Sequence, residues 1–379
     1  MYLLEHDAKE ILAQDRIPVP AGCLATSGAE LRDGVLPPGP WMVKGQIAAG
    51  GRGKAGIIRK AATVAELRAR INAIVGSTVN GRRVEAVLIE QQVSGAEEAY
   101  VSLMLDAPGA GVRVIVSERG GVDVEALAPN AIHTAVAAPN TEAIARCVSQ
   151  LSGAMPERLG APLRDAALRL AQVFLEREAL LVEINPLFIR PDGSWVAGDT
   201  KLVTDDNALE RQPALREFLA RRAAAYPEAA LKLGHGFDYV VVDPEGEIGL
   251  LTTGAGLSMM LIDELRAAGL KPYNFLDIRT GGLRGEITRL VSVLEWIARG
   301  PLVRVLLINI FAGITELGEF SRLLVTALAK SPLRVPVVAR LVGNGLPAAR
   351  EVLARAGIPL HTNLDDAVAE VRAHLSKSE

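Results

Sequence analysis

Residues 181–202 restrict the fold more than any other stretch, because they predict a β-hairpin together with its register. Two runs of strand-forming residues flank the Pro-Asp-Gly sequence at 191–193, and a glycine at the last position of a three-residue loop suits a hairpin. With that loop, Arg190 pairs with Ser194, and the pairing of all residues along both strands follows.

This register predicts that four polar side chains share one face of the hairpin. Asn185 lies across from Asp199, and Glu183 lies across from Lys201, so the alternation of side chains along a strand directs all four the same way. Carboxylate and amide oxygens are ligands that Mg²⁺ takes, with water and substrate phosphates completing its shell. A solvated hairpin face with one cross-strand ion pair fits the same pattern, and both interpretations are open at this point.

Length and composition exclude several classes of protein. A chain of 379 residues predicts two or more domains, and its 49% hydrophobic residues can fill large cores. The formal charge is −3 with both signs interspersed, which argues against nucleic acid or an anionic membrane as partner. Residues 1–15 form an amphipathic helical pattern rather than a signal peptide. Cys23 and Cys147 form no metal-type cluster, and we expect reduced thiols in the cytoplasm.

From Phe237 onward the sequence alternates strands, glycine-rich turns and helices. The strands are predicted at 239–243, 249–252, 271–277, 303–311, 335–340 and 359–362. Such alternation predicts a parallel, doubly wound α/β sheet, whose ligands bind at the carboxyl ends of the strands. A charged, alanine-rich stretch after Asn207 separates this part from the first, so we expect domains at 1–232 and 236–379.

Residues 45–54 (GQIAAGGRGK) form a glycine-rich loop after a strand. Such a loop exposes backbone N–H groups to a phosphate, although a purely structural turn has the same composition. It matches neither the Walker A pattern nor GxGxxG. Lys44, Arg52 and Lys54 together can neutralise a triphosphate. Combined with the hairpin, the loop indicates a site that places MgATP between two lobes.

Long motifs in this chain resemble those of the β subunits of succinate–CoA ligases, a group that includes the malate–CoA ligases. The motifs are IPVP at 17–20, VKGQIAAGGRGKAG at 43–56, VEINPL at 182–187, DTK at 199–201, GAGL at 254–257, NFLDI at 274–278 and NIFAGI at 309–314. The resemblance spans nearly the whole chain. It implies an ATP-grasp fold of two subdomains at 1–232 and a flavodoxin-like CoA-ligase domain at 236–379.

The resemblance also implies roles for individual residues. The positions that correspond to nucleotide-binding residues are Lys44, Gly51, Arg52, Gly53, Glu90, Val93 and Glu98. Asn185 and Asp199 correspond to the Mg²⁺ ligands, and Glu183 to a carboxylate that positions the phosphorylated histidine. The substrate-binding positions are Thr253, Gly313, Ile314 and Thr315. Pro20 is similar to the form of the family that uses ATP rather than GTP.

In the family's reaction, ATP phosphorylates a histidine, which passes the phosphoryl group to a carboxylate before CoA captures the acyl phosphate. The histidine belongs to an α subunit, which also supplies most of the CoA site. None of the five histidines here lies in a glycine-rich setting typical of a phosphoryl acceptor. We therefore expect an α-subunit partner, in a heterodimer or a heterotetramer.

Several substitutions fall at positions that the family uses. Ala48 replaces a histidine, Thr253 replaces an asparagine, Arg279 interrupts a glycine-rich run, and residues 313–317 replace a GIVRCD-type loop. A ligase for a different acid would explain this, because Thr keeps a hydroxyl and Arg279 adds a fork for a second anion. Drift in a solvated loop is the alternative for Arg279. A paralogue with a structural or regulatory role is the other hypothesis, and the retained metal positions weigh against it.

Overall fold

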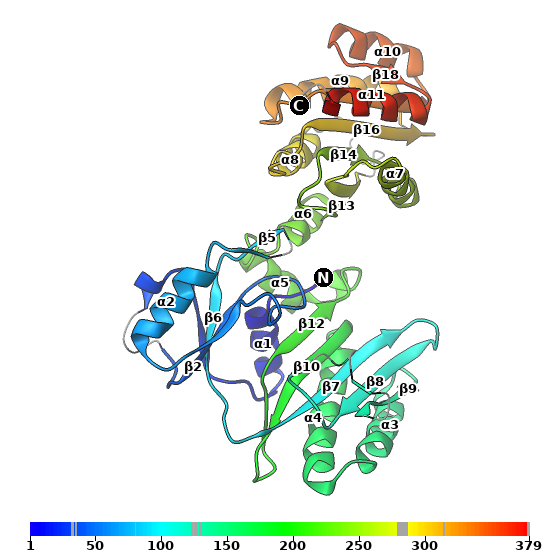
Figure 1. The fold of residues 1–379 in the computed structure, drawn as a ribbon. Coiled ribbons are helices and arrows are strands. Elements are labelled where there is room, and N and C mark those ends of the chain that lie inside the picture. The colour runs from blue at the N-terminus through cyan, green and yellow to red at the C-terminus, as the bar shows by residue number, and fades with distance from the viewer. Residues whose placement is uncertain are drawn as a thin grey trace. The chain divides into compact units, whose positions relative to one another are not determined.

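The computed structural model describes residues 1–31, 34, 36–79, 81–122, 124, 127–128, 131–278, 287–313 and 315–376 (Figure 1). The chain divides into two compact units, Met1–Leu215 and Arg216–Glu379. Arg279 and Ile314, two positions singled out by the sequence, lie outside the described residues. None of the helices in the described part combines the length and the apolar character needed to cross a membrane.

The first subdomain of unit 1 is a four-stranded antiparallel sheet in the order β1-β6-β2-β3. Its strands are β1 (Gly22–Ala25), β2 (Trp41–Gly45), β3 (Ile58–Ala61) and β6 (Val87–Gln91). Helix α2 (Val64–Ile74) buries Leu67, Ile71 and Ile74 against it, which is the spacing of one helical face. The short elements are the 3₁₀ turn Gly28–Glu30 and the pair β4 (Thr78–Val79) and β5 (Arg82–Arg83).

The second subdomain is an antiparallel sheet in the order β11-β10-β7-β8-β9, with β12 also paired to β10. Its strands are β7 (Glu97–Asp106), β8 (Gly111–Ser117), β9 (His133–Ala137), β10 (Ala179–Ile189), β11 (Trp195–Ala197) and β12 (Thr200–Thr204). Helices α3 (Thr141–Gly153) and α4 (Glu157–Glu176) pack on this sheet (Figure 1). Helix α1 (Glu5–Gln14) contacts β12, so the beginning of the chain lies beside the hairpin.

The register predicted for the hairpin is confirmed. Arg190 donates its backbone N–H to Ser194 O at 2.8 Å, and Glu183 pairs with Lys201. Gly193 has a φ of 80°, the left-handed conformation that the loop requires. Strand pairing is interrupted between β11 and β12, but Asn185 still donates its backbone N–H to Asp199 O at 2.9 Å.

Helix α6 (Pro227–His235) and the end of α5 (Pro213–Arg221) belong to unit 2. The division at Leu215 falls within α5, ahead of α6. Leu231 of α6 belongs to the core that also contains Phe237, and Val241 of β13 (Asp238–Val241) donates its N–H to the Glu228 carboxylate. The polar sequence of α6 suggested a linker, whereas its apolar face is part of the second core.

A parallel sheet with helices on both faces forms unit 2, as the alternating pattern predicted. The order is β14-β16-β17-β18, with strands β14 (Ile248–Thr252), β16 (Val305–Ala312), β17 (Val337–Gly343) and β18 (Leu360–His361). Helices α7 (Ala255–Ala267) and α11 (Leu364–Ser376) fill one core. Helices α8 (Thr288–Ile297), α9 (Leu317–Lys330) and α10 (Leu346–Arg355) fill the other.

The prediction of six parallel strands in unit 2 was wrong in one respect. β13 and β15 (Asn274–Asp277) form a separate antiparallel pair. The Asn274 side chain exchanges two hydrogen bonds of 2.9 Å with the backbone of Leu250, so an amide side chain takes the place of ladder bonds beside β14. A strand pattern gives no information on this kind of pairing.

Replacing Gly193 by alanine tests how far the hairpin depends on its turn. No atom lies within 4 Å of the added Cβ, so the cost is purely the left-handed backbone, about 1 kcal/mol of unfolding free energy. Gly153→Ala, at the end of α3 and equally open, is the matched control and should change stability by less than about 0.5 kcal/mol. Urea unfolding followed by tryptophan fluorescence makes the comparison, and equal effects of both changes would contradict it.

Candidate active site

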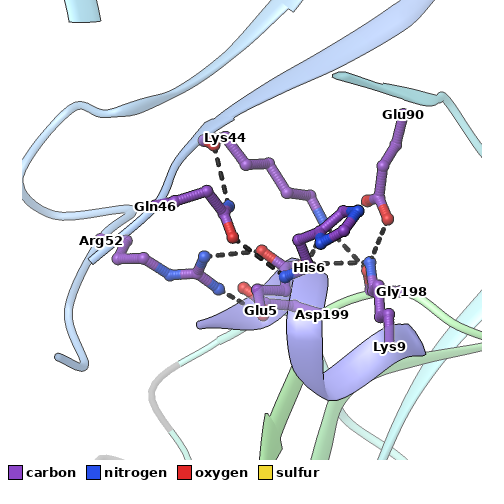
Figure 2. A network of polar contacts seen from close by, with 9 residues as sticks. All are labelled: Glu5, His6, Lys9, Lys44, Gln46, Arg52, Glu90, Gly198 and Asp199. Carbon is purple, nitrogen blue, oxygen red and sulfur yellow. Dashed lines mark hydrogen bonds and ion pairs between the residues drawn. The ribbon is translucent and has the colours of Figure 1, made fainter. Parts of the chain in front are cut away.

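A buried cluster of charged side chains joins α1 to both sheets of unit 1 (Figure 2). Its cations are Lys9, Lys44 and Arg52, and its carboxylates are Glu5, Glu90 and Asp199. Lys44 lies on β2, Arg52 on the glycine-rich loop after it, Glu90 on β6, and Asp199 in the gap of the hairpin. The sequence thus placed four of these residues in one site, and the fold brings those four together with two residues of α1.

Lys44 is fixed by three oxygens of the protein. Its ammonium donates to Glu5 Oε1 at 2.7 Å and to Gly198 O at 2.8 Å, and it pairs with Glu90 Oε2 at 2.8 Å. An ammonium has three donors, so this set uses all of them. Burial alone lowers the pKa of Lys44, but the Glu5 and Glu90 carboxylates outweigh it and raise the pKa above its usual value. Lys44 therefore stays charged.

Arg52 connects the glycine-rich loop to the hairpin. Its Nη1 pairs with Glu5 Oε2 at 2.6 Å, and its Nη2 donates to Asp199 Oδ1 at 2.5 Å across 147 residues of sequence. Burial raises the pKa of Asp199, as does the nearby Glu5 carboxylate, whereas Arg52 opposes the change. Asp199 keeps 27% of its side chain exposed, so a cation from solvent can reach it.

Glu5 and Lys9 of α1 are the functional candidates that the sequence analysis missed. Lys9 Nζ lies 2.8 Å from Glu5 Oε1, donates to Gly198 O at 2.6 Å and also pairs with Glu90. Burial raises the pKa of Glu5, but Arg52, Lys44 and Lys9 together lower it well below its usual value. A signal was present: residues 5, 8, 9 and 12 share the buried face of one helix, and two of them are charged.

The loop after β2 keeps its backbone open. Gly51 has a φ of 76°, and Gly51 and Gly53 are exposed, with no atom within 4 Å of an added Cβ at either position. Gln46 holds the start of this loop, because it accepts from His6 N at 2.9 Å and donates to Lys44 O at 3.0 Å. The backbone of these glycines is therefore open to a ligand from solvent.

The hairpin offers the donor types that Mg²⁺ prefers. Asn185 and Asp199 supply an amide oxygen and a carboxylate from opposed positions joined by a backbone hydrogen bond. Asn185 Oδ1 accepts from Gly121 N at 2.7 Å, and its Nδ2 donates to Val122 O at 3.0 Å, so the amide is oriented by the chain after β8. This donor set fits a hard divalent cation.

Two further predicted residues lie in the hairpin, at Glu183 on β10, and beside it, at Glu98 on β7. Glu183 accepts a hydrogen bond from Tyr100 Oη at 3.1 Å. The Glu98 carboxylate lies against Gly121, close enough that an added Cβ there would collide with it, so Glu98 and Asn185 border the same loop.

A cavity of about 270 Å³ lies in unit 1, between residues 19–21, residues 91–94 and the hairpin. Pro20 and Val93 line it from two different segments, and Arg190 and Val196 line it from the hairpin. Pro20 and Val93, two positions that the resemblance associates with the nucleotide, thus share one hollow directly after Glu90 on β6.

The predicted substrate positions lie in unit 2 at the carboxyl edge of the parallel sheet. Thr253 follows β14 and Gly313 follows β16, two adjacent strands that pair Thr252 with Asn309. Thr315 lies just beyond, half-buried. Within the altered loop, the Glu316 carboxylate accepts from Gly318 N at 3.1 Å and Glu319 N at 2.6 Å, so it caps the start of α9.

Comparison with known proteins identifies both parts of the chain. Residues 2–189 match the ATP-grasp domain family, and residues 251–373 match the CoA-ligase family. The chain thus joins an ATP-grasp domain to a CoA-ligase domain. It is 37% identical to the β subunit of the ADP-forming succinate–CoA ligase of Chloroflexus aurantiacus, over 98% of this chain and 99% of that one. This protein belongs to the family of succinate–CoA ligase β subunits.

Other relatives agree with this assignment. The β subunit of the GDP-forming succinate–CoA ligase of Thermus thermophilus is 36% identical over 93% of each chain. Among solved structures, an ATP citrate lyase from Methanothrix soehngenii in complex with citrate and coenzyme A matches with a TM-score of 0.69, 20% identity and 95% coverage of each chain. At that identity the structural match shows the fold alone.

Lys9→Met tests whether the charge of Lys9 on α1 stabilises the buried cluster. The change leaves Glu5 and Glu90 with less compensation in a buried setting, and should lower the unfolding free energy of unit 1 by about 3 kcal/mol. Lys60→Met, at an exposed position of β3, is the control and should stay within about 0.5 kcal/mol. Urea unfolding gives both values. A cost for Lys9→Met no larger than that of the control would show that the cluster contributes nothing to stability.

Proposed function

We propose that this chain is the nucleotide-binding β subunit of an ATP-dependent, ADP-forming carboxylate–CoA ligase that works with an α subunit in the cytoplasm. The observation that carries the proposal is the contact between Arg52 and Asp199. It joins the predicted phosphate loop to the predicted metal-binding hairpin, two motifs far apart in sequence. The family of the chain and its two matched domains support the same reaction class.

Different residues of unit 1 would bind the phosphates and the metal ion of MgATP. The backbone of Gly51, Arg52 and Gly53 would bind phosphate oxygens, with Lys44 supplying charge. Asn185 and Asp199 would hold Mg²⁺, which neutralises phosphate charge during phosphoryl transfer. Glu183, oriented by Tyr100, would position the phosphorylated histidine of the α subunit. Most of the CoA site would come from that subunit.

The hollow beside Pro20 and Val93 is suited to the nucleotide base. Relatives of similar identity include both ADP-forming and GDP-forming enzymes. Membership of the family therefore leaves the choice between adenine and guanine open, and the residues of this pocket would make it. Pro20 favours ATP. Glu98, whose carboxylate lies against Gly121, would lie toward the ribose.

The acid substrate would differ from succinate. Thr253, Gly313 and Thr315 lie at the sheet edge where this fold binds ligands. Thr in place of an asparagine changes the number of donors, and Glu316 is engaged in capping α9. Together with Ile314 and Arg279, these substitutions favour an acid with an additional polar or anionic group. A purely regulatory subunit is not favoured, because such a chain has no physical need for the oxygen donors at Asn185 and Asp199.

The dependence on an α subunit can be tested directly. Purified chain should bind MgATP in a calorimeter, because the phosphate and metal residues are all its own. It should show no CoA-ligase turnover until an α-type subunit from the same genome is added. CoA-ester formation by the single chain would contradict the two-subunit mechanism. A chain that fails to bind MgATP would contradict the assignment of unit 1.

Asp199→Asn tests the metal assignment. A neutral amide binds Mg²⁺ more weakly, so phosphorylation of the α subunit should fall by about a hundredfold, the scale of losing one electrostatic contact to a transition state. Glu142→Gln removes an exposed carboxylate from α3 and should leave the rate unchanged. Radiolabelled phosphate on the α subunit gives the readout. Normal labelling with the Asp199→Asn variant would remove the residue from the site.

A further inference from the structure

We propose that two side chains of the cluster compete with the ligands of this site. The Glu5 carboxylate competes with nucleotide phosphate for Lys44 and Arg52, and the Arg52 guanidinium competes with a divalent cation for Asp199. The inference deepens the proposed function and rests on it, since it concerns the affinity of the same site. It assigns α1 a part in setting that affinity.

The ammonium of Lys44 has no donor left for a phosphate. Glu5, Glu90 and Gly198 together use all three N–H donors of the ammonium. A phosphate oxygen can therefore bind Lys44 only in exchange for one of these partners. Gly198 O is fixed by the hairpin backbone, and Lys9 holds both carboxylates, but of these two only Glu5 also pairs with Arg52. Glu5 is the carboxylate that contacts all three cations of the cluster, so it is the direct competitor.

Arg52 occupies the carboxylate that is predicted to bind the metal ion. Its two terminal nitrogens are engaged by Glu5 on one side and Asp199 on the other. The cation paired with Asp199 is thus the guanidinium of the phosphate loop itself. Binding of a metal ion to this carboxylate requires Arg52 to move or to share it, because two cations on one carboxylate repel each other. A metal ion at Asp199 and a phosphate at Arg52 therefore both displace contacts of the same guanidinium.

Lys9 makes the exchange possible. The three cations and three carboxylates of the cluster balance, so the arrangement carries no net charge although it is almost fully buried. When Lys44 and Arg52 turn to a phosphate, Glu5 keeps a partner in Lys9 at 2.8 Å on the next turn of the same helix. A buried carboxylate without any partner would be far more costly.

The phosphate half is tested with MgADP and calorimetry on the whole chain. Glu5→Gln should bind MgADP about tenfold more tightly than wild type, since a close charge competitor is removed. Glu10→Gln, exposed on the same helix, is the matched control and should bind as wild type. The double variant Glu5→Gln/Lys9→Met restores charge balance, so it should recover the stability lost in the single variant and keep the tighter binding.

Two results would overturn this half of the proposal. Weaker binding by both Glu5 variants would mean that Glu5 positions the cations instead of competing for them. Unchanged binding would mean that Glu5 has no effect on the site. A wild-type chain without MgADP affinity would refute the proposed function itself, and the phosphate half with it.

The metal half needs no nucleotide, so it is judged separately with Mn²⁺ alone. Paramagnetic resonance of free Mn²⁺ should show that Arg52→Gln binds the ion at least about tenfold more tightly than wild type. Adding Asp199→Asn to that variant should abolish the gain, which places the ion on this carboxylate. Equal Mn²⁺ binding by wild type and Arg52→Gln, or a gain that survives Asp199→Asn, would overturn it. Urea unfolding of each variant confirms that it is folded.

Discussion

The arrangement of unit 1 depends on the pairing of the Glu5 carboxylate with three cations. Glu5 is buried, and an ionised carboxylate in that setting is tolerable only when its oxygens are paired. Lys9, Lys44 and Arg52 provide that pairing from one helix, one strand and one loop. Because each cation also contacts a second acceptor, the requirement to compensate one charge determines how α1, the first sheet and the hairpin meet.

This requirement explains why residues at the start of the chain contribute to a site built mainly from later segments. Gly198 O accepts from both Lys9 and Lys44, so the hairpin gap offers a backbone acceptor next to Asp199. Gln46 links His6 of α1 to the backbone of Lys44. These polar contacts anchor the start of the glycine-rich loop, while Gly51 and Gly53 remain open.

The sequence predicted the parts of this site that follow local rules. Strand alternation and the Pro-Asp-Gly turn predicted the pairing of Glu183 with Lys201, and the strand–turn–helix rhythm predicted the parallel sheet of unit 2. Glu5 and Lys9 were missed because a charged residue on an amphipathic helix is expected to face water. The antiparallel pairing of β15 and the placement of α6 depend on tertiary contacts of Asn274 and Leu231, which no local pattern encodes.

The charge cluster and the predicted substrate positions fall in different units. The charge cluster is complete within unit 1, whereas Thr253, Gly313 and Thr315 lie at a sheet edge of unit 2. A change of the predicted acid-binding residues therefore leaves the balance of charges around Glu5 untouched, because no cluster member comes from unit 2. Buried charges tolerate few substitutions, while a partly exposed loop end tolerates many. This physical separation is consistent with the proposal that nucleotide binding is retained while the acid differs.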